Sequence, residues 1–590
     1  MSLEVLSDQR EKTYQSARPG DTGGKQSQPF VRTHALSGFL AMLAIAGVAL
    51  IRTINLGADA PKGLPTEADY GIYVDEGYKT LWARNMVTFG TGRWHTGDDY
   101  SGWLTASPVT QGAFYVGFRV FGQSLEAARI ISVMWFALFL IAFGVAYYDH
   151  RSSPVFWVGL FMLGFQYVLW VLSRTAIFEI AALSVFYAGL VLLRRFSNNA
   201  ITSAIVVFAV GVVVTFGIKQ NAPAIIAPAL LGILAPWVVQ KKRVKEFLVV
   251  LLVAAVGLFV VSYLQKIGFA VPFGSLLRKT SLFSPGMEVR RFLLNPILEA
   301  DPFLVILAHA CAISVLLYRP KFFDHNSYRA ALMSIVFLGT AALATTQNLR
   351  LRYCALLLPA FILVVVEWCI AEKQNSWALP GRRAQQISTY AAMLVVCVLA
   401  YDLTFLVGWS LTVFPEVGGH TPLLRLPIAG VVAFLCWKKR NVFLSAPVLR
   451  TFIFATIVAF ALFNSYKVGN SLLRPTWQVR AVSNQLDRIL PKGATVAGDW
   501  IPLFAIGTNL HVLYTNPVFN QAKRFEDLRP SHFLYCDTDG GEIVKRTIEQ
   551  SKGVQLGAPL LQSDYIGVQL TLYPLHYKDS QVSAEAETRD

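Results

Sequence analysis

The sequence predicts a mainly α-helical, polytopic membrane protein of about thirteen spans, with its N-terminus inside and a small C-terminal α/β domain outside. Of its 590 residues 54% are hydrophobic and only 15% are charged, whereas soluble domains average about 25% charged. Apolar stretches long enough to span a hydrocarbon core of about 30 Å recur along the chain. Near Arg474 the composition changes, and short alternating segments replace the apolar stretches.

The N-terminal residues 1–35 are polar and carry basic residues, among them Arg10, Lys12 and Arg32. A cleaved signal peptide has a short basic start followed by an apolar stretch. This segment is too long and too hydrophilic for that, and we expect it to form a cytoplasmic tail.

The apolar segments lie within residues 36–470, the predicted transmembrane domain. With the tail inside, the connections that fall in the cytoplasm carry Arg194, Arg195, Lys241–Arg243 and Lys438–Arg440, as the positive-inside rule requires. The twelfth segment is the weakest, and its loss would place the C-terminus in the cytoplasm. The segments are centred near residues 46, 137, 163, 185, 209, 231, 256, 309, 338, 362, 398, 430 and 456.

The net charge of +16 does not indicate nucleic-acid binding. The basic residues are spread over short loops and form no single patch interleaved with aromatic residues. The six cysteines show no spacing typical of a zinc site or a disulfide framework. No Walker loop and no dinucleotide fingerprint occurs, so ATP-driven transport has no support.

The first outer loop, residues 57–125, contains two adjacent carboxylates, Asp75 and Glu76. An isolated Asp-Glu pair is usually a solvated turn or the start of a helix, but at a membrane edge it can also supply a base or an ion ligand. His95 lies in the same loop near Asp98 and Asp99, without a second histidine at ligand spacing. A structural histidine is therefore favoured over a metal ligand.

Residues 471–578 are predicted to form a small soluble α/β domain, and residues 579–590 a disordered tail. Helical apolar spacing predicts helices over Trp477–Leu490 and Ile543–Lys552. The segment Cys536-Asp-Thr-Asp-Gly-Gly lacks the later ligands of a calcium loop and is interpreted as a turn after a strand. Short strands are predicted over Ala494–Ala497, His511–Tyr514, His532–Cys536 and Val568–Leu572.

Several short motifs lie in order on the predicted outer side. The first is Asp75-Glu-Gly-Tyr78 with Ala83-Arg-Asn85, followed by Pro108, Phe121–Arg129, Ser173–Glu179, Gly217-Ile-Lys219 and Leu351-Arg-Tyr353 with Pro359. Their order resembles the membrane glycosyltransferases of the C type. Within that superfamily they are most similar to the protein mannosyltransferase-like branch, which includes lipid A aminoarabinose transferases and rhizobial lipopolysaccharide galacturonosyltransferases. The resemblance covers roughly residues 36–370.

This resemblance implies an inverting transferase of the inner membrane, with its active site on the periplasmic face. The donor would be a polyprenyl phosphate sugar, and the acceptor lipopolysaccharide, another glycan, a lipid or a protein. Asp75 would be the base that takes the proton from an acceptor hydroxyl. Glu76 would orient the acceptor or Asp75, although the adjacent pair leaves open which one is the base. Glu179 would position the acceptor or a divalent metal, whose presence the sequence leaves undecided.

Departure of the sugar leaves a lipid phosphate, whose charge calls for fixed cations at the outer headgroup level. Lys219, Arg350 and Arg352 are placed there, and Arg352 with Tyr353 matches an Arg-Tyr pair of the family. For each cation the competing interpretation is snorkelling to phospholipid headgroups, and for Glu179 it is a pair with Arg174 at a helix start. Arg290 and Arg291 lie in a loop too variable to align and are weaker candidates.

The alternative function is a transporter or flippase of a lipid-linked sugar. Such proteins usually place ionisable residues and broken helices near the bilayer midplane, often in two related halves. Here the charged candidates lie at the outer edge, and the sequence shows no internal repeat. The identity of the sugar and of the acceptor does not follow from the sequence.

Overall fold

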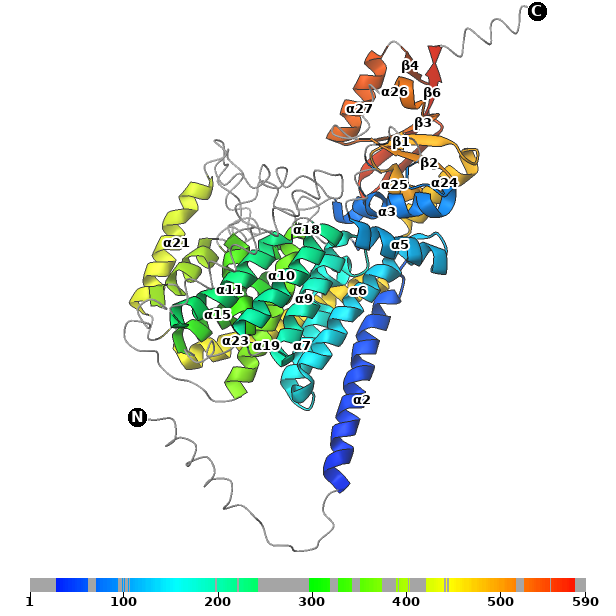
Figure 1. The fold of residues 1–590 in the computed structure, drawn as a ribbon. Helices are drawn as coiled ribbons and strands as arrows, with labels where there is room; N and C mark the ends of the chain where they lie inside the picture. Colours follow the sequence, from blue (N-terminus) through cyan, green and yellow to red (C-terminus); the bar gives the residue numbers. More distant parts are fainter. Residues whose placement is uncertain are drawn as a thin grey trace, which may run out of the picture.

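Helices make up most of the protein, and a small sheet lies near the C-terminus (Figure 1). A computed structural model describes residues 28–61, 71–93, 98, 100, 104, 107–196, 199–219, 222–241, 297–318, 327–341, 351–373, 389–390, 392–401, 403, 421–439, 442, 445–515, 525–551 and 553–578.

The larger part of the described chain is a bundle of apolar helices (Figure 1). A π-helical turn, η4 (Val213–Ile218), ends α10, and a second, η6 (Ile335–Gly339), follows α16. The bundle helices are α2 (Gln28–Leu50), α6 (Leu125–Ala146), α7 (Pro154–Phe165), α8 (Tyr167–Leu172), α9 (Phe178–Phe196), α10 (Ala200–Val212), α11 (Pro223–Lys241), α15 (Pro302–Tyr318), α16 (Ser327–Ser334), α18 (Leu351–Cys354), α19 (Leu358–Lys373), α21 (Thr421–Lys438) and α23 (Ala446–Leu473).

Five helical stretches among the described residues are long and apolar enough to cross a membrane, and the others are shorter or more charged. The predicted segment near residue 256 lies outside the described residues, and each of the other predicted segments contains helix. The predicted mainly helical fold with several apolar helices is therefore confirmed, whereas the thirteen spans and their orientation stay predictions. The five stretches begin at Leu36, Leu125, Ala200, Leu351 and Ala446.

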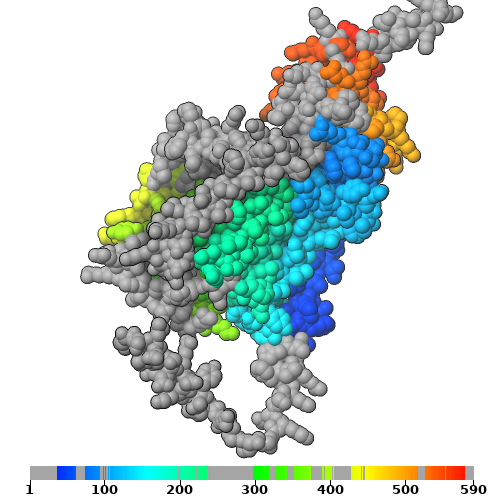
Figure 2. Space-filling model, in the orientation of Figure 1, coloured from blue at the N-terminus to red at the C-terminus, as the bar shows by residue number. Residues whose placement is uncertain are grey.

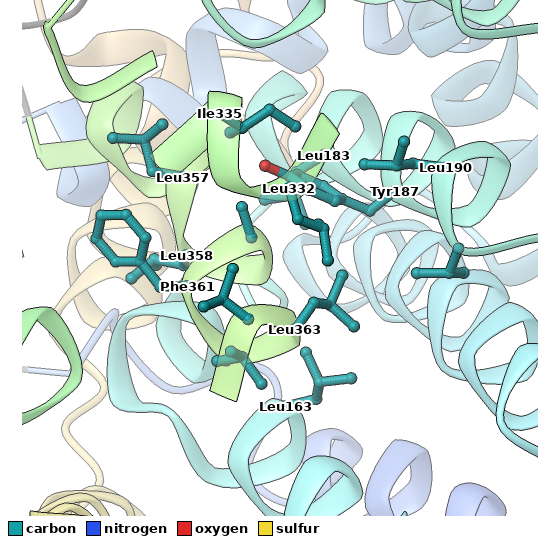
Figure 3. Close-up of a cluster of buried hydrophobic side chains, with 14 of the residues drawn as sticks. Leu163, Leu183, Tyr187, Leu190, Leu332, Ile335, Leu357, Leu358, Phe361 and Leu363 are labelled. Atoms are coloured by element: carbon teal, nitrogen blue, oxygen red, sulfur yellow. The ribbon is translucent and has the colours of Figure 1, made fainter. Parts of the chain in front are cut away.

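The core of the bundle lies around α19, which is buried on all sides because its residues are apolar all round. Leu358, Phe361 and Leu363 of this helix lie in the same cluster as Leu183 and Tyr187 of α9 (Figure 3). The Tyr187 hydroxyl donates a hydrogen bond of 2.8 Å to the Leu356 carbonyl, so the one polar atom of that side chain is satisfied inside the core. This packing places the start of α19 against α9.

Two helices of the first outer segment, α3 (Gly71–Phe89) and α5 (Pro108–Phe121), lie across one end of the bundle beside α6 (Figure 1). Helix α5 buries Phe114 and Phe118 and exposes Val116 and Val120, so it has one apolar face turned outward. The acidic pair thus lies on a helix of 19 residues rather than in an open loop.

The C-terminal sheet has the strand order β2-β1-β3-β6-β4, with β5 also paired to β6. Strands β1, β2 and β3 are parallel, β6 pairs antiparallel with β3, and β4 and β5 each pair antiparallel with β6. The predicted strands are confirmed, but β4 and β5 were not predicted. The elements are α24 (Gln478–Ile489), β1 (Thr495–Gly498), α25 (Ile501–Phe504), β2 (His511–Tyr514), α26 (Phe525–Leu528), β3 (His532–Cys536), α27 (Asp539–Gln550), β4 (Val554–Leu556), β5 (Leu561–Tyr565) and β6 (Val568–Tyr577).

This C-terminal unit packs directly on α3 and shares one hydrophobic cluster with it. Arg84 of α3 donates hydrogen bonds to the carbonyls of Thr508 (2.8 Å) and Leu510 (2.6 Å). The Tyr565 hydroxyl donates to the Tyr73 carbonyl at 3.2 Å. In the space-filling view the unit projects from the same end of the molecule as the first outer segment (Figure 2). The sheet therefore covers the helix that carries the acidic pair.

Candidate active site

Asp75 and Glu76 are both buried and point to different partners. Successive side chains of a helix diverge by about 100°, so α3 directs the two carboxylates to separate surroundings. Glu76 turns toward Arg129 in α6, and Asp75 turns toward Arg352 in α18. The two acids are consequently suited to different roles.

Glu76 is fully occupied by structural contacts. Arg129 of α6 donates to both of its carboxylate oxygens, at 2.5 and 2.7 Å, and the Ala176 amide donates to Oε2 at 2.8 Å. Arg129 also donates to the carbonyls of Leu56 and Ala58. This bidentate pair joins α3, α6 and the turn before α9, which makes Glu76 an anchor of α3.

Asp75 lies in a cluster of charged side chains. Its Oδ2 accepts a hydrogen bond from Arg352 Nη1, which α18 places 277 residues further along the chain. Lys79, one helical turn after Asp75, has its Nζ 4.0 Å from the same oxygen. Arg352 is 5% exposed and Lys79 is 8% exposed, so water screens these interactions weakly.

Glu179 is the second carboxylate of the cluster. Its Oε1 lies 2.8 Å from Lys219 Nζ and 3.8 Å from Arg352 Nε. Lys219 follows the π-helical turn η4, and its amide donates to the Val214 carbonyl at 2.7 Å. The Tyr353 ring lies 5.2 Å from Lys219 Nζ and 5.1 Å from the Arg352 guanidinium carbon, distances at which a cation and a ring attract.

The structure thus brings five of the candidate residues together: Asp75, Glu179, Lys219, Arg352 and Tyr353. The alternative pairing of Glu179 with Arg174 is not observed, since Arg174 Nη2 donates to the Asn55 carbonyl at 3.1 Å. Four other candidates, Arg350, His95, Arg290 and Arg291, lie outside the described residues.

Lys79 is a cluster residue that the sequence did not single out. Its position four residues after Asp75 would have indicated it, if that stretch had been predicted to be helical. Burial lowers the pKa of Lys79 to about 8, although Asp75 opposes this shift; Lys219 and Arg352 add to it. Helix α3 is not one of the stretches long and apolar enough to span a membrane.

Asp499 follows β1 at the carboxyl ends of the parallel strands, the edge where open α/β sheets place ligands. The Tyr78 hydroxyl donates to Asp499 Oδ1 at 3.3 Å. The ring of Tyr514, at the end of β2, lies tilted against the rings of Tyr78 and Tyr100, with centroids 4.5 Å and 4.4 Å away. Burial raises the pKa of Asp499 to about 6, the Tyr78 hydrogen bond opposes this, and the negative charge of Asp75 adds to it. The C-terminal unit therefore brings a third acid close to Asp75.

The described residues hold no group of three or more His, Cys, Asp or Glu side chains that suits a metal ion. Glu179 instead lies against two cations. Chemically, the cluster offers carboxylates as proton acceptors beside amine and guanidinium groups as anion ligands. They come from α3, the first turn of α9, α18 and the residue that follows η4.

No family model matches the sequence, and no curated protein has detectable sequence similarity to it. Two solved structures of ArnT from Cupriavidus metallidurans are similar to the chain. The one bound to undecaprenyl phosphate is 12% identical with a TM-score of 0.46, over 90% of this chain and 97% of that chain. The apo structure is 13% identical with a TM-score of 0.46, over 92% and 98%.

Proposed function

We propose that this chain is an inverting membrane glycosyltransferase that moves a sugar from a polyprenyl phosphate to a cell-envelope acceptor on the periplasmic face of the inner membrane. One observation carries the proposal: Asp75 and Glu179 are buried together with Lys79, Lys219 and Arg352. A transfer from a lipid phosphate needs both groups, a base for the acceptor and cations for the departing phosphate. The motifs that resemble the C-type transferases supply most of these residues.

In this proposal the donor phosphate lies against Arg352, Lys219 and Lys79. As the bond between the anomeric carbon and the phosphate oxygen breaks, its electron pair stays on that oxygen, and the cations stabilise the added charge. The acceptor hydroxyl oxygen forms the new bond to the anomeric carbon from the opposite face and gives its proton to Asp75. A single displacement of this kind inverts the anomeric configuration.

The contact between Arg352 and Asp75 implies that the donor binds before Asp75 takes the acceptor proton. A guanidinium that donates to Asp75 Oδ2 occupies one of the positions that an acceptor proton requires. A donor phosphate competes with the two carboxylates for Arg352, because phosphate oxygens match the guanidinium fork. Donor binding would thereby release Asp75 as the acceptor arrives. Glu76, with both oxygens bonded, would hold α3 in place and not take a proton itself.

Transfer is tested with the purified full-length protein, a radiolabelled polyprenyl phosphate sugar and extracted cell envelope. The Asp75→Asn variant is expected to lose transfer by about 10²- to 10⁴-fold, the usual contribution of a general base. Asp149→Asn is the matched control, because Asp149 pairs with Arg195 at the surface and its side chain is 70% exposed.

Unchanged transfer by Asp75→Asn would remove Asp75 from the mechanism. The alternative, a flippase, predicts a different result in the same preparation. The wild-type protein would then move labelled donor across vesicles and leave the acceptor unlabelled.

A further inference from the structure

A cavity of about 260 Å³ lies apart from the charged cluster, between the start of the first outer segment and the end of α23. Its polar lining comes from Asp59, from Arg174 in the turn before α9, and from four residues at or just after the end of α23. Those four are Asn470 and Ser471, which belong to α23, and Arg474 and Thr476, which follow it. Residues more than 290 positions apart in the chain therefore build this site together.

Two donors in the cavity wall have no partner among the described residues. Arg174 is 6% exposed, and its Nη1 makes no hydrogen bond there, while Nη2 donates to the Asn55 carbonyl. The hydroxyl of Ser471 is likewise buried without a partner in the described part of the chain. A buried donor left unbonded costs about 1–3 kcal/mol, so both atoms call for a ligand that accepts hydrogen bonds.

The charge of the cavity favours an anion. Arg174 and Arg474 contribute two guanidinium groups, and Asp59 is the one carboxylate in the described lining. Both oxygens of Asp59 face the start of α24, where they accept from the amides of Gln478 (2.7 Å) and Val479 (2.9 Å). The charge that a ligand in the cavity meets is therefore mainly that of the two arginines. The Arg174 guanidinium also lies 5.0 Å from the Trp170 ring centroid, which helps to hold it in place.

The surroundings of the cavity indicate where its ligand comes from. Apolar side chains next to it in the chain are exposed: Leu50 (66%) and Ile54 (48%) at the end of α2, and Leu473 (83%) at the end of α23. In a membrane-spanning bundle such exposed side chains face lipid. An anionic group reaching this cavity would thus arrive with acyl chains beside α2 and α23.

We propose that this cavity binds the phosphodiester headgroup of an anionic lipid, at a site separate from the catalytic cluster. Arginine and hydroxyl donors at the outer headgroup level match phosphate oxygens. The turn that carries Arg174 also supplies the Ala176 amide that holds Glu76. A bound lipid thereby braces the turn that anchors α3. The proposal stands independently of the transfer reaction, because it rests on different residues.

Binding is tested by native mass spectrometry of the full-length protein, delipidated in detergent and titrated with phosphatidylglycerol, phosphatidylcholine or inorganic phosphate. Wild-type protein is expected to retain phosphatidylglycerol in preference to phosphatidylcholine. Arg174→Gln is expected to bind phosphatidylglycerol about tenfold more weakly, the effect of losing one charge-assisted contact. Arg480→Gln is the matched control, because this exposed arginine pairs with Glu126 outside the cavity.

Arg474→Gln and Ser471→Ala keep the test decisive if Arg174→Gln does not fold, because Arg474 is exposed and Ser471→Ala removes only a hydroxyl group. Each is expected to weaken phosphatidylglycerol binding. Equal binding by the wild-type protein and by the folded cavity variants would overturn the proposal. If inorganic phosphate saturates the protein without displacing any lipid, the assignment to a lipid headgroup is overturned.

Discussion

Arg352 lies between the two carboxylates of the cluster, in contact with Asp75 and 3.8 Å from Glu179. Its neighbour Lys219 holds Glu179 from the other side at 2.8 Å. Charges this close in a buried site interact strongly, and removal of one leaves its partner unpaired. The cluster is therefore a single unit in which the residues are interdependent, and substitutions within it will not be additive.

The charge of Lys79 makes donor binding depend on pH. The pKa of Lys79 is lowered to about 8 by burial, so the amine is a cation at pH 7 and is mostly neutral at pH 9.5. If it binds the donor phosphate, the KM for the donor is expected to rise about tenfold over this range. In Lys79→Arg the cation persists, and the rise should disappear. Donor KM is measured from pH 6.5 to 9.5 for both proteins; the same rise in Lys79→Arg would contradict the assignment.

Asp499 gives the stability of the protein a pH dependence of its own. Its folded-state pKa of about 6 lies above the ordinary 3.8, so the folded protein binds this proton more tightly than the unfolded chain does. The corresponding stability is present below about pH 4 and is lost as the pH rises through 6. The stability of Asp499→Asn should therefore lack this decrease with rising pH. Compared with wild type, the variant should be more stable at pH 7 than at pH 4.

The measurement is the thermal unfolding midpoint of both proteins at pH 4, 5, 6 and 7. Asp487→Asn, at an exposed position of α24, serves as the control and should follow wild type at every pH. A constant difference between Asp499→Asn and wild type across this range would show that burial of Asp499 does not carry the effect.

At the scale of elements, the pair of Glu76 and Arg129 determines where α3 lies. Glu76→Ala leaves Arg129 buried without its carboxylate partner, which should lower the unfolding free energy by about 3–5 kcal/mol. Glu126→Ala is the matched control. Glu126 pairs with Arg480 at the surface, and its loss should cost less than about 1 kcal/mol.

Denaturant unfolding of the two variants separates these cases. The double variant Glu76→Leu with Arg129→Met should recover part of the loss, because neither charge is then buried alone. Equal stability of Glu76→Ala and Glu126→Ala would show that the pair does not anchor α3. A destabilised but active Glu76→Ala would also distinguish an anchor from a base.

Periodicity allowed the helices and most strands to be predicted, since apolar length and alternation are local properties of the sequence. It failed at α3, whose residues 73–85 mix charged and aromatic side chains because the helix is covered by the bundle on one side and by the sheet on the other. The spacing of apolar residues in this stretch does not show that the sheet covers the other side of the helix. The π-helical turn before Lys219 and the strands β4 and β5 likewise depend on their neighbours rather than on their own sequence.

The candidate site was predictable to the extent that its residues lie in motifs. Asp75, Glu179, Lys219 and Arg352 were identified in this way, and the structure brings them together. The roles of Arg129 and Asp499 were not, because each depends on a contact between distant segments: 53 residues separate Glu76 from Arg129, and 421 separate Tyr78 from Asp499. A pairing over such a distance leaves no periodic signal.

At the scale of the whole molecule, the C-terminal unit and the bundle meet across α3. Gly77, in the middle of that helix, lies directly against the backbone of Pro502 and Leu503 in α25, with no room for a β-carbon. Asp59 and Gln123 extend the contact by hydrogen bonds to the backbone of the C-terminal unit. The close approach of these two backbones holds Asp499 near Asp75.

Gly77→Ala should therefore separate the C-terminal unit from α3 while the helical bundle stays folded. The added methyl group meets backbone atoms, which cannot move aside as a flexible side chain would. A displacement of about 1 Å at a catalytic group can cost about 100-fold in rate, so transfer should fall by that order. Gly112→Ala is the control, because a β-carbon at this helical position meets nothing within 4 Å. Hydrogen exchange of residues 501–514 should increase in Gly77→Ala and stay unchanged in Gly112→Ala. Wild-type transfer and wild-type exchange in Gly77→Ala would mean that the C-terminal unit acts without this contact.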